Sequence, residues 1–132
     1  MEMINDAVSP VALSSSLEDY IEAIYLLSEV SPEVRVSDIA GKLKVAKPSV
    51  HIALHALEER HFITHKRYGT VHLTDDGRSA AMMIYARHTE IKRFFEQVLK
   101  IDTDIAEKDA CAAEHVLSPE AISAMSEMVK NI

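Results

Sequence analysis

The sequence predicts a mainly α-helical protein in which two groups of helices are separated by one β hairpin. Three observations favour this fold class. Apolar residues recur at helical spacing in several stretches, only 3 Gly and 4 Pro are present to make turns, and β-branched residues gather in one short region. The 132 residues are enough for one domain or for two small domains that share a core.

The composition is that of an ordinary globular protein, with 48% apolar and 27% charged residues. The single Cys excludes an internal disulfide framework and a zinc site made only of Cys. We see no stretch that is long and apolar enough to span a membrane, and no basic start followed by an apolar run as in a secretion signal. We therefore expect a cytoplasmic protein without a membrane partner.

The first helix is expected after a flexible arm of residues 1–13, in which Pro10 opposes helix formation. Ser16 is the expected N-cap, and Asp19 follows three residues later as in a capping box. The helix should end near Ser31-Pro32, because the residue before a proline disfavours helical geometry. Its apolar stripe consists of Leu17, Ile21, Ile24 and Leu27.

Two further helices with a short joint match a helix-turn-helix. Ser37 is expected to cap the first of them, over residues 38–43, and Lys47-Pro48-Ser49 starts the second, which continues to Arg60. A proline fits there because its missing N–H would be unpaired in the first turn of a helix. Residues 62–74 then read as two short strands around a turn at 67–69, which makes residues 1–74 a winged helix-turn-helix domain.

Three helices are expected in residues 75–132. Thr74 caps a long helix that runs to about Leu99, and acids occupy its first turn. The next helix opens at Asp102 or Thr103 and ends near Leu117, and Ser118-Pro119-Glu120 starts the last one. Apolar stripes on the end of this region either close the core of the monomer or form a homodimer interface, as we expect for Val116, Leu117, Ile122, Met125 and Val129.

Charge is distributed unevenly along the chain, although the net charge is −7. Residues 1–34 hold seven acids and no Lys or Arg, and residues 35–93 hold eleven Lys or Arg against six acids. Residues 94–132 hold three Lys and eight acids. A basic middle between acidic ends predicts one surface that binds an anion and a separate acidic region that binds a cation.

The basic region has the residue types that a DNA-reading helix needs at its start. Ser and His can donate hydrogen bonds to base edges, Pro and Ile can contact a thymine methyl group, and Lys and Arg can contact phosphates. The candidates for binding double-stranded DNA are Lys42, Lys44, Lys47, Pro48, Ser49, His51, Ile52, Lys66 and Arg67. The alternatives are a merely solvated charged face, or a winged helix that binds another protein.

The acidic ends contain candidate ligands for a transition metal. Two carboxylates three residues apart share a face of the first helix, and a thiol, a carboxylate and an imidazole share a face near residue 111. The candidates are Asp19, Glu22, His88, Cys111, Glu114 and His115. This mixture suits Mn²⁺, Fe²⁺, Co²⁺ or Zn²⁺ better than Mg²⁺ or Ca²⁺. Each residue alone is more often a solvated acid, a hydrogen-bonded histidine or a small buried cysteine.

The motifs together resemble a known family. They are SLEDYIEAIYLLSE, VRVSDIAGKLKVAKPSVHIALHALEERHFI, LTDDGR, ARH and DACAAEHVLS, in this order over about residues 16–120. They resemble the metal-dependent transcriptional repressors of the diphtheria toxin repressor and manganese transport regulator type. The resemblance implies a cytoplasmic homodimeric repressor of metal uptake or homeostasis genes, with a winged helix on operator DNA and residues 75–132 as a metal-binding and dimerisation domain.

The resemblance implies that the six candidate ligands hold a divalent corepressor, Mn²⁺ or Fe²⁺, at a site that Co²⁺, Zn²⁺ or Ni²⁺ can also occupy. Asp19 and Glu22 resemble the manganese branch of the family, and so does the lack of an SH3-like third domain. Cys111 before Glu114-His115 resembles the iron branch. Many members carry an acid four residues after the histidine of the long helix, where it serves an additional metal, but this chain has Lys92.

Two rival functions remain at this stage. One is a winged-helix regulator that responds to an organic ligand or a protein instead of a metal. The other is a small metalloenzyme, in which an open metal position activates water. We do not expect an enzyme, because the sequence lacks a Gly-rich phosphate loop, an H-E-x-x-H motif and a nucleophile elbow.

Overall fold

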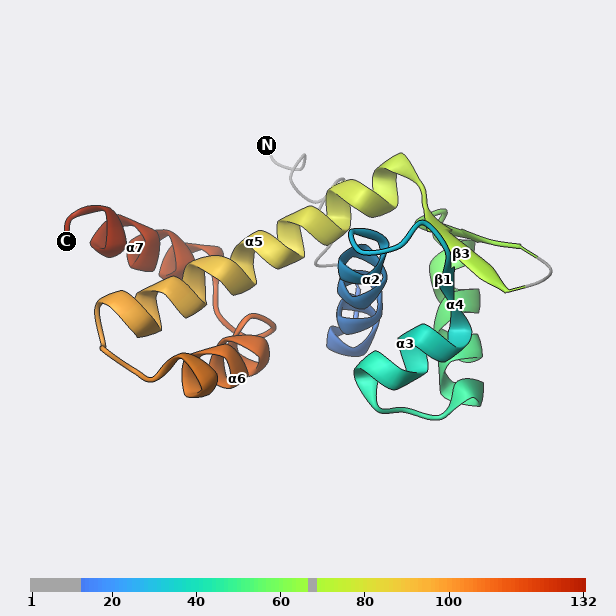
Figure 1. The fold of residues 1–132 in the computed structure, drawn as a ribbon. Coiled ribbons are helices and arrows are strands. Elements are labelled where there is room, and N and C mark those ends of the chain that lie inside the picture. The colour runs from blue at the N-terminus through green and yellow to red at the C-terminus, as the bar shows by residue number, and fades with distance from the viewer. Residues whose placement is uncertain (1–12, 67–68) are drawn as a thin grey trace, which may run out of the picture. The chain divides into compact units, whose positions relative to one another are not determined.

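The computed structural model describes residues 13–66 and 69–132, which form helices and one small sheet. The chain divides into two compact units, Met1–Met83 and Ile84–Ile132. The predicted flexible arm lies outside the described residues except for Leu13, which is buried. The helical content confirms the predicted mainly α fold (Figure 1).

The first described helix, α2, spans Ser15–Ser28. Its N-cap is Ser14, whose hydroxyl accepts a hydrogen bond from the backbone N–H of Leu17 at 3.2 Å. The predicted capping box of Ser16 and Asp19 is therefore wrong, because the N-cap lies two residues before Ser16. Three consecutive serines each satisfy the chemistry of an N-cap, so the local sequence does not distinguish between them.

The helix-turn-helix consists of α3, Val36–Leu43, and α4, Lys47–Glu59. Ser37 is not the cap of α3, as we had expected; Arg35 is, and its backbone N–H donates to the Asp38 carboxylate at 2.9 Å. Lys44 ends α3 in the left-handed region, with φ 57°, which reverses the chain into α4. Pro48 lies in the first turn of α4, where no intrahelical N–H is lost.

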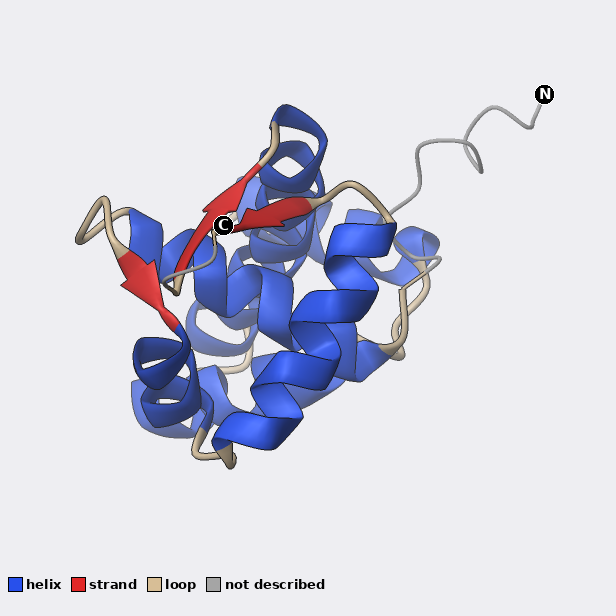
Figure 2. Ribbon diagram, turned by 90° about the vertical axis from the view of Figure 1, so that its right-hand side faces the viewer, coloured by secondary structure: helices blue, strands red, loops and turns tan. Residues whose placement is uncertain are grey.

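A three-stranded antiparallel sheet, red in Figure 2, completes the winged helix-turn-helix. The predicted hairpin is present as β2, Ile63–His65, and β3, Thr70–Leu73, and Gly69 has the positive φ, 97°, that its turn requires. A third strand, β1, Val34–Arg35, was not predicted. It pairs with β3 in the order β1-β3-β2, with Val34 opposite Val71.

The core of the first unit is formed by apolar side chains from all of its elements. The helices α2, α3 and α4 contribute the faces that their periodicity predicts, and each strand contributes one inward side chain. Fully buried members are Ile21, Ile24, Val34, Ile39, Val50, Leu54, Leu57, Ile63 and Val71. Burial of one such side chain stabilises a fold by roughly 1.5–3 kcal/mol, so this core fixes the exposed side of α4.

The long helix α5, Asp75–Gln97, contains the boundary between the two units. Thr74 caps it as predicted, because its hydroxyl accepts the backbone N–H of Gly77 at 3.0 Å. The same hydroxyl donates to the backbone oxygen of His61 at 2.7 Å, which ties the start of α5 to the end of α4. A Cβ at position 77 would lie 1.9 Å from the backbone oxygen of Phe62, so only glycine fits.

The second unit adds α6, Thr103–Ala113, and α7, Pro119–Lys130, beside the C-terminal half of α5 (Figure 1). Asp102 and Ser118 cap these helices as predicted. Helix α6 does not continue to about Leu117, as we had expected, but ends at Ala113. Its predicted end depended on the next strong helix-breaking signal, Ser118-Pro119, whereas the chain already leaves the helix in a turn after Glu114. Among the described residues, no helix has the length and apolarity needed to cross a membrane.

We expect Gly77→Ala to lower the free energy of unfolding by about 1–3 kcal/mol, because the added methyl group collides with backbone atoms of Phe62. The matched control is Gly41→Ala. Gly41 lies inside α3 with nothing within 4 Å of the added Cβ, so that variant should gain about 0.5–1 kcal/mol from helix propensity. Urea unfolding measures both; equal stability of the two variants would contradict the close approach at Gly77.

Candidate metal centre and nucleic-acid interface

The second unit contains a buried histidine held between two carboxylates. His88 of α5 has both ring nitrogens in hydrogen bonds, with Nδ1 2.9 Å from Oε1 of Glu114 and Nε2 3.0 Å from Oε1 of Glu107. His88 is 6% exposed and Glu114 is 2% exposed. Since a neutral imidazole has only one N–H, two carboxylate partners favour the doubly protonated ring.

These contacts raise the pKa of His88 to about 9. The hydrogen bond to Glu114 is the largest cause, burial acts against it, and Glu107 adds to the increase. Burial also opposes ionisation of Glu107, but hydrogen bonds with His88 and Lys92 outweigh that effect and lower the pKa of Glu107. The hydrogen bond with the Glu107 carboxylate raises the pKa of Lys92. The metal-free cluster is thus a network of opposite charges.

The predicted ligands of this unit fall on two sides of the His88 ring. On the Nδ1 side, Glu114 caps the end of α6, and its Oε2 lies 3.6 Å from Nε2 of His115. On the Nε2 side, Cys111 and Glu107 of α6 offer ligand atoms that lie with one of His88 within 4.8 Å of one another. The prediction that Cys111, Glu114 and His115 share one continuous helix is wrong, because α6 ends before the last two.

The donor set of the Nδ1 side fits a divalent metal ion. Oε2 of Glu114 is buried and accepts no hydrogen bond in the described part of the chain. A buried oxygen without a donor is destabilising, and a cation would compensate it. Carboxylate oxygen and imidazole nitrogen are ligands of Mn²⁺ and Fe²⁺. The observation supports a cation site at Glu114.

The two predicted ligands of the first unit lie on α2 as expected from their spacing. Glu22 is 7% exposed and Asp19 is partly exposed. Buried carboxylates are uncommon unless they are paired or bind a cation, so the burial of Glu22 is informative. Both residues have interactions in the metal-free chain.

Glu107 is a member of the cluster that sequence reasoning missed. It precedes Cys111 by four residues, so the two share a face of α6, and this spacing was available in the sequence. What the sequence could not indicate was the packing of α6 on α5, which brings Glu107 to the ring of His88.

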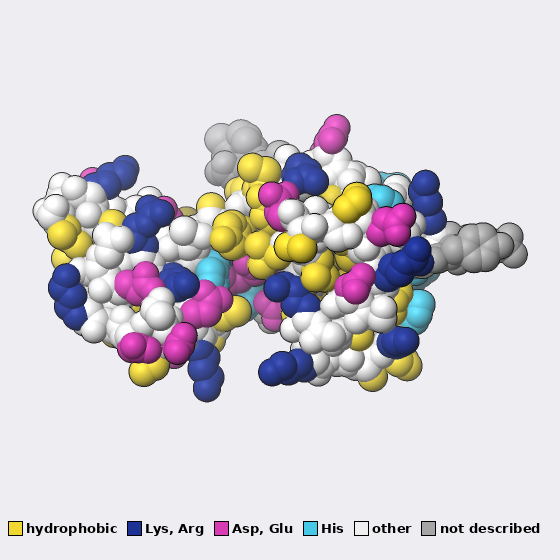
Figure 3. Space-filling model, viewed as in Figure 1, with side chains coloured by type: hydrophobic (Ala, Val, Ile, Leu, Met, Phe, Trp, Pro, Cys, Tyr) yellow, Lys and Arg dark blue, Asp and Glu magenta, His cyan; other side chains and the backbone are white. Residues whose placement is uncertain are grey.

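The predicted nucleic-acid interface is exposed in the first unit. All of its members that the structure describes are exposed, and Ile52 is 73% exposed in spite of being apolar. Arg67 lies outside the described residues. In Figure 3, Lys and Arg side chains lie over the part of the molecule that carries α3, α4 and the strands, and others lie over the second unit. An exposed isoleucine beside cations suits contact with DNA better than contact with water alone.

A cleft of about 390 Å³ opens where the start of α4 faces the sheet. Its side chains include two stacked histidines, His51 and His65, with ring centroids 6.1 Å apart. Within residues 13–66 and 69–132, no acidic side chain lines it; the lining residues are Arg35, Val36, Ser37, Lys47, His51, His65 and Gly69. Sequence reasoning missed Arg35 because it belongs to the unpredicted strand β1, whereas His65 lies in the predicted strand β2 but was not among the DNA-binding candidates. The cleft extends the basic surface from α4 to the wing.

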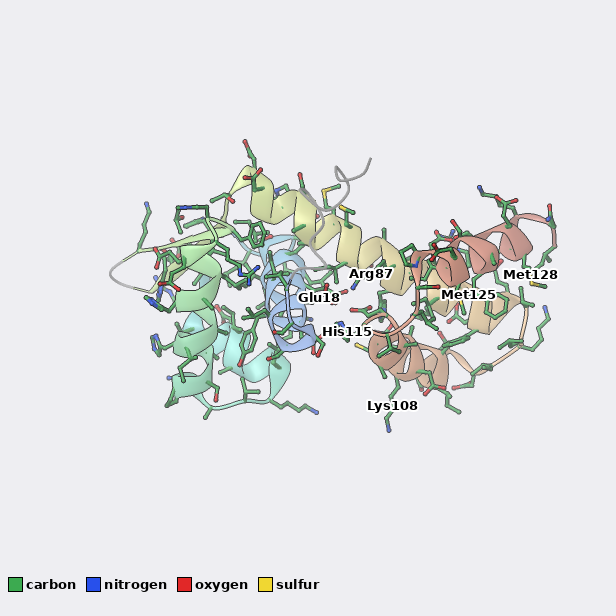
Figure 4. The ribbon with its side chains drawn as sticks, turned by 180° about the vertical axis from the view of Figure 1, so that it is seen from behind. Glu18, Arg87, Lys108, His115, Met125 and Met128 are labelled. Atoms are coloured by element: carbon green, nitrogen blue, oxygen red, sulfur yellow. The ribbon has the colours of Figure 1, made fainter. Side chains whose placement is uncertain are left out.

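The predicted dimer interface lies at the C-terminal end of the second unit. Val116 is 79% exposed, and α7 has no buried residue at all. Met125 and Met128 extend from this helix in Figure 4. Helix α7 is amphipathic, and its apolar residues Ile122, Met125 and Val129 are only partly buried in their own unit, which is typical of a surface that another subunit covers.

Comparison with known proteins identifies both halves. Residues 12–71 match the N-terminal DNA-binding domain of the iron-dependent repressors, and residues 74–132 match their metal-binding and dimerisation domain. The HTH-type transcriptional regulator MntR of Shouchella clausii (strain KSM-K16) is 33% identical over 115 residues, which are 87% of this chain and 80% of the relative.

Solved structures agree in fold. The IdeR protein of T. acidophilum is 22% identical with a TM-score of 0.78, over 86% of this chain and 53% of that one. A manganese-dependent transcriptional repressor in complex with manganese is 24% identical with a TM-score of 0.80, over 86% of this chain and 52% of that one. This chain spans about half the length of these solved repressors.

The matches confirm the resemblance seen in the sequence, and the family is one of repressors and not of enzymes, as expected. With the two domains matched in order and a relative one third identical over most of its length, the chain belongs to the iron-dependent repressor family of metal-dependent, DNA-binding transcriptional repressors.

Proposed function

We propose that this chain is a cytoplasmic homodimeric repressor of metal uptake or homeostasis genes, which binds operator DNA when Mn²⁺ or Fe²⁺ is bound. We propose residues 1–74 as the DNA-binding domain and residues 75–132 as the metal-binding and dimerisation domain. The observation that carries the proposal is the buried Glu114 carboxylate, which is hydrogen-bonded to His88 through one oxygen and has no hydrogen bond at the other.

The proposed ligands are Asp19, Glu22, His88, Glu114 and His115. Their support is the chemistry of the residue types, the burial of three of them and the family to which the chain belongs. Cys111, the sixth ligand implied by the resemblance, is grouped with Glu107 on the other side of the His88 ring and is considered below.

A bound divalent ion supplies two positive charges that offset the carboxylates around it. Without that charge, Asp19, Glu22 and Glu114 repel one another when they are brought together. In the proposed switch, one ion is ligated both by Asp19 and Glu22 of α2 and by ligands of the second unit. Since α2 packs in the core beneath α4, these two carboxylates couple the metal to the DNA-binding helix.

Manganese is the favoured ion in this proposal. The proposed donors are oxygen and nitrogen atoms only, which suit Mn²⁺. Fe²⁺ accepts the same donors. Co²⁺, Zn²⁺ and Ni²⁺ bind the same residue types and are expected to occupy the site in vitro.

The DNA contacts are proposed on the exposed side of α4 and its flanks. Base edges would be read by Pro48, Ser49, His51 and Ile52, and phosphates would be bound by Lys42, Lys44, Lys47, Lys66 and Arg67. A dimer through Val116, Leu117, Ile122, Met125 and Val129 would present two α4 helices to DNA. Successive major grooves on one face lie about 34–36 Å apart, so the pairing geometry decides the affinity.

We predict that Mn²⁺ strengthens binding of the full chain to its promoter DNA by about 5–150-fold at fixed salt, the range of typical coupling free energies of 1–3 kcal/mol. Glu114→Gln and His115→Ala should remove most of this effect, because each loses one proposed ligand. Fluorescence anisotropy with labelled DNA measures it with and without metal.

The matched control for these variants is Glu120→Gln, at an exposed acid in the first turn of α7 that belongs to no proposed site. Its response to Mn²⁺ should equal that of the wild type. If Glu114→Gln responds to Mn²⁺ as strongly as Glu120→Gln does, Glu114 is not a ligand of the switch. If the wild type binds DNA equally well with and without Mn²⁺ at fixed salt, the metal switch is refuted and a regulator that responds to an organic ligand or a protein remains.

The proton on Nδ1 of His88 competes with a metal ion, because a protonated nitrogen has no lone pair to donate. The raised pKa also affects the stability of the metal-free chain. A folded pKa of about 9 against 6.5 in the unfolded chain means that the imidazolium network stabilises the fold fully below pH 6.5. This contribution is lost as the pH rises to about 9.

We therefore predict that the metal-free chain loses roughly 2–3 kcal/mol of unfolding free energy between pH 6.5 and 9 through His88. Urea unfolding in the presence of a chelator measures the loss. His88→Gln serves as the reference, since it carries every other titrating group. If the unfolding free energy of the wild type changed with pH in parallel with that of His88→Gln, the carboxylates around His88 would not stabilise its imidazolium form.

A further inference from the structure

On the Nε2 side of the His88 ring, which we call the outer side, a lysine lies where a metal ion could otherwise bind. Nζ of Lys92 lies 3.1 Å from Oε1 of Glu107, and Nε2 of His88 lies 3.0 Å from the same oxygen. Lys92 follows His88 by four residues on α5, so both project from one face of that helix toward α6. One carboxylate oxygen therefore receives two positively charged donors.

The residues on this side are otherwise a set of metal ligands. His88, Glu107 and Cys111 offer a nitrogen, an oxygen and a sulfur atom within 4.8 Å of one another. Imidazole, carboxylate and thiolate together suit Co²⁺, Zn²⁺ and Fe²⁺. Lys92 changes this chemistry, because an ammonium group has no lone pair while it is charged and repels a divalent cation at short range.

We propose that Lys92 acts as a tethered cation that occupies the outer side of this cluster and excludes a second metal ion from His88, Glu107 and Cys111. This inference deepens the proposed function, which assigns the first ion to the Nδ1 side of the same ring. The chain then carries one ion where its ligand chemistry allows two, and Cys111 ligates no metal in the wild-type protein.

Exclusion of the second ion gives Glu107 a positioning role. A histidine that ligates a metal through one nitrogen commonly donates the other N–H to a carboxylate, which fixes the orientation of the ring. Glu107 accepts from Nε2 of His88, so the lone pair of Nδ1 is directed toward the Glu114 side once its proton has left. Lys92 offsets the charge of Glu107 and keeps it from acting as a ligand.

The experiment counts metal ions and detects the thiolate. The full-length wild type, Lys92→Glu and Lys92→Gln are titrated with Co²⁺ under anaerobic reducing conditions. Bound Co²⁺ per chain is measured by equilibrium dialysis and calorimetry, and Co²⁺–thiolate charge transfer by near-ultraviolet absorption. Lys92→Glu removes the ammonium and adds a carboxylate, and Lys92→Gln only removes the charge, which covers the case in which the first variant folds poorly.

The matched control is Lys108→Glu, the same charge reversal at an exposed lysine of α6 that points away from the helix bundle in Figure 4. We expect no thiolate band in the wild type or in Lys108→Glu. We expect one additional Co²⁺ per chain and a thiolate band in Lys92→Glu, and a weaker band in Lys92→Gln. Addition of Cys111→Ser to Lys92→Glu should abolish the band, and Lys92→Arg should behave as the wild type.

The results separate this inference from the proposed function. A wild type that binds no ion, together with a Lys92→Glu variant that gains one ion and the band, would refute the proposed site at Glu114 and support the role of Lys92. A thiolate band in the wild type would overturn the inference. So would the lack of an added ion and of a band in both Lys92 variants, or an equal gain in Lys108→Glu.

Discussion

The structure of the second unit depends on the compensation of one buried negative charge. Glu114 is almost fully buried, and a carboxylate in such a place must receive hydrogen bonds or a positive charge. In the metal-free chain the imidazolium of His88 supplies both, and in the proposed repressor a divalent ion replaces its proton. The same requirement therefore stabilises the His88–Glu114 contact and makes the carboxylate suitable for a metal ion.

Local structure places these groups with little freedom. Helix α6 ends at Ala113, so Glu114 lies at a helix end whose direction is fixed by the buried Ala106 and Ala110. On the other side of the ring, Glu107 of α6 is hydrogen-bonded to His88, and Lys92 of α5 forms an ion pair with Glu107. In the first unit the apolar core fixes the exposed face of α4 in a comparable way. Function thus resides in exposed or charged groups that the two cores orient.

Periodicity and capping chemistry predicted every described helix, because these signals act over a few residues. Thr74 was recognised as a cap for this reason, and the turn of the wing followed from β-branched runs around Gly69. Strand β1 was not predicted because its two residues are defined by pairing with β3, at Thr70 and Val71, far along the chain. Glu107 was not identified as a member of the cluster for a similar reason, since its contact with His88 depends on how α6 packs on α5. Residue chemistry identified candidate ligands, but it could not divide them between the two nitrogens of His88.

In the proposed switch, a single divalent ion is held jointly by α2 and by the residues around Glu114. Anomalous scattering from crystals of the full chain grown with Mn²⁺ tests this claim most directly. We predict one manganese peak per chain, ligated by Asp19 or Glu22 together with His88, Glu114 and His115. A peak ligated by only one of the two units, or a manganese-free Glu114 in crystals that hold manganese elsewhere, would contradict it.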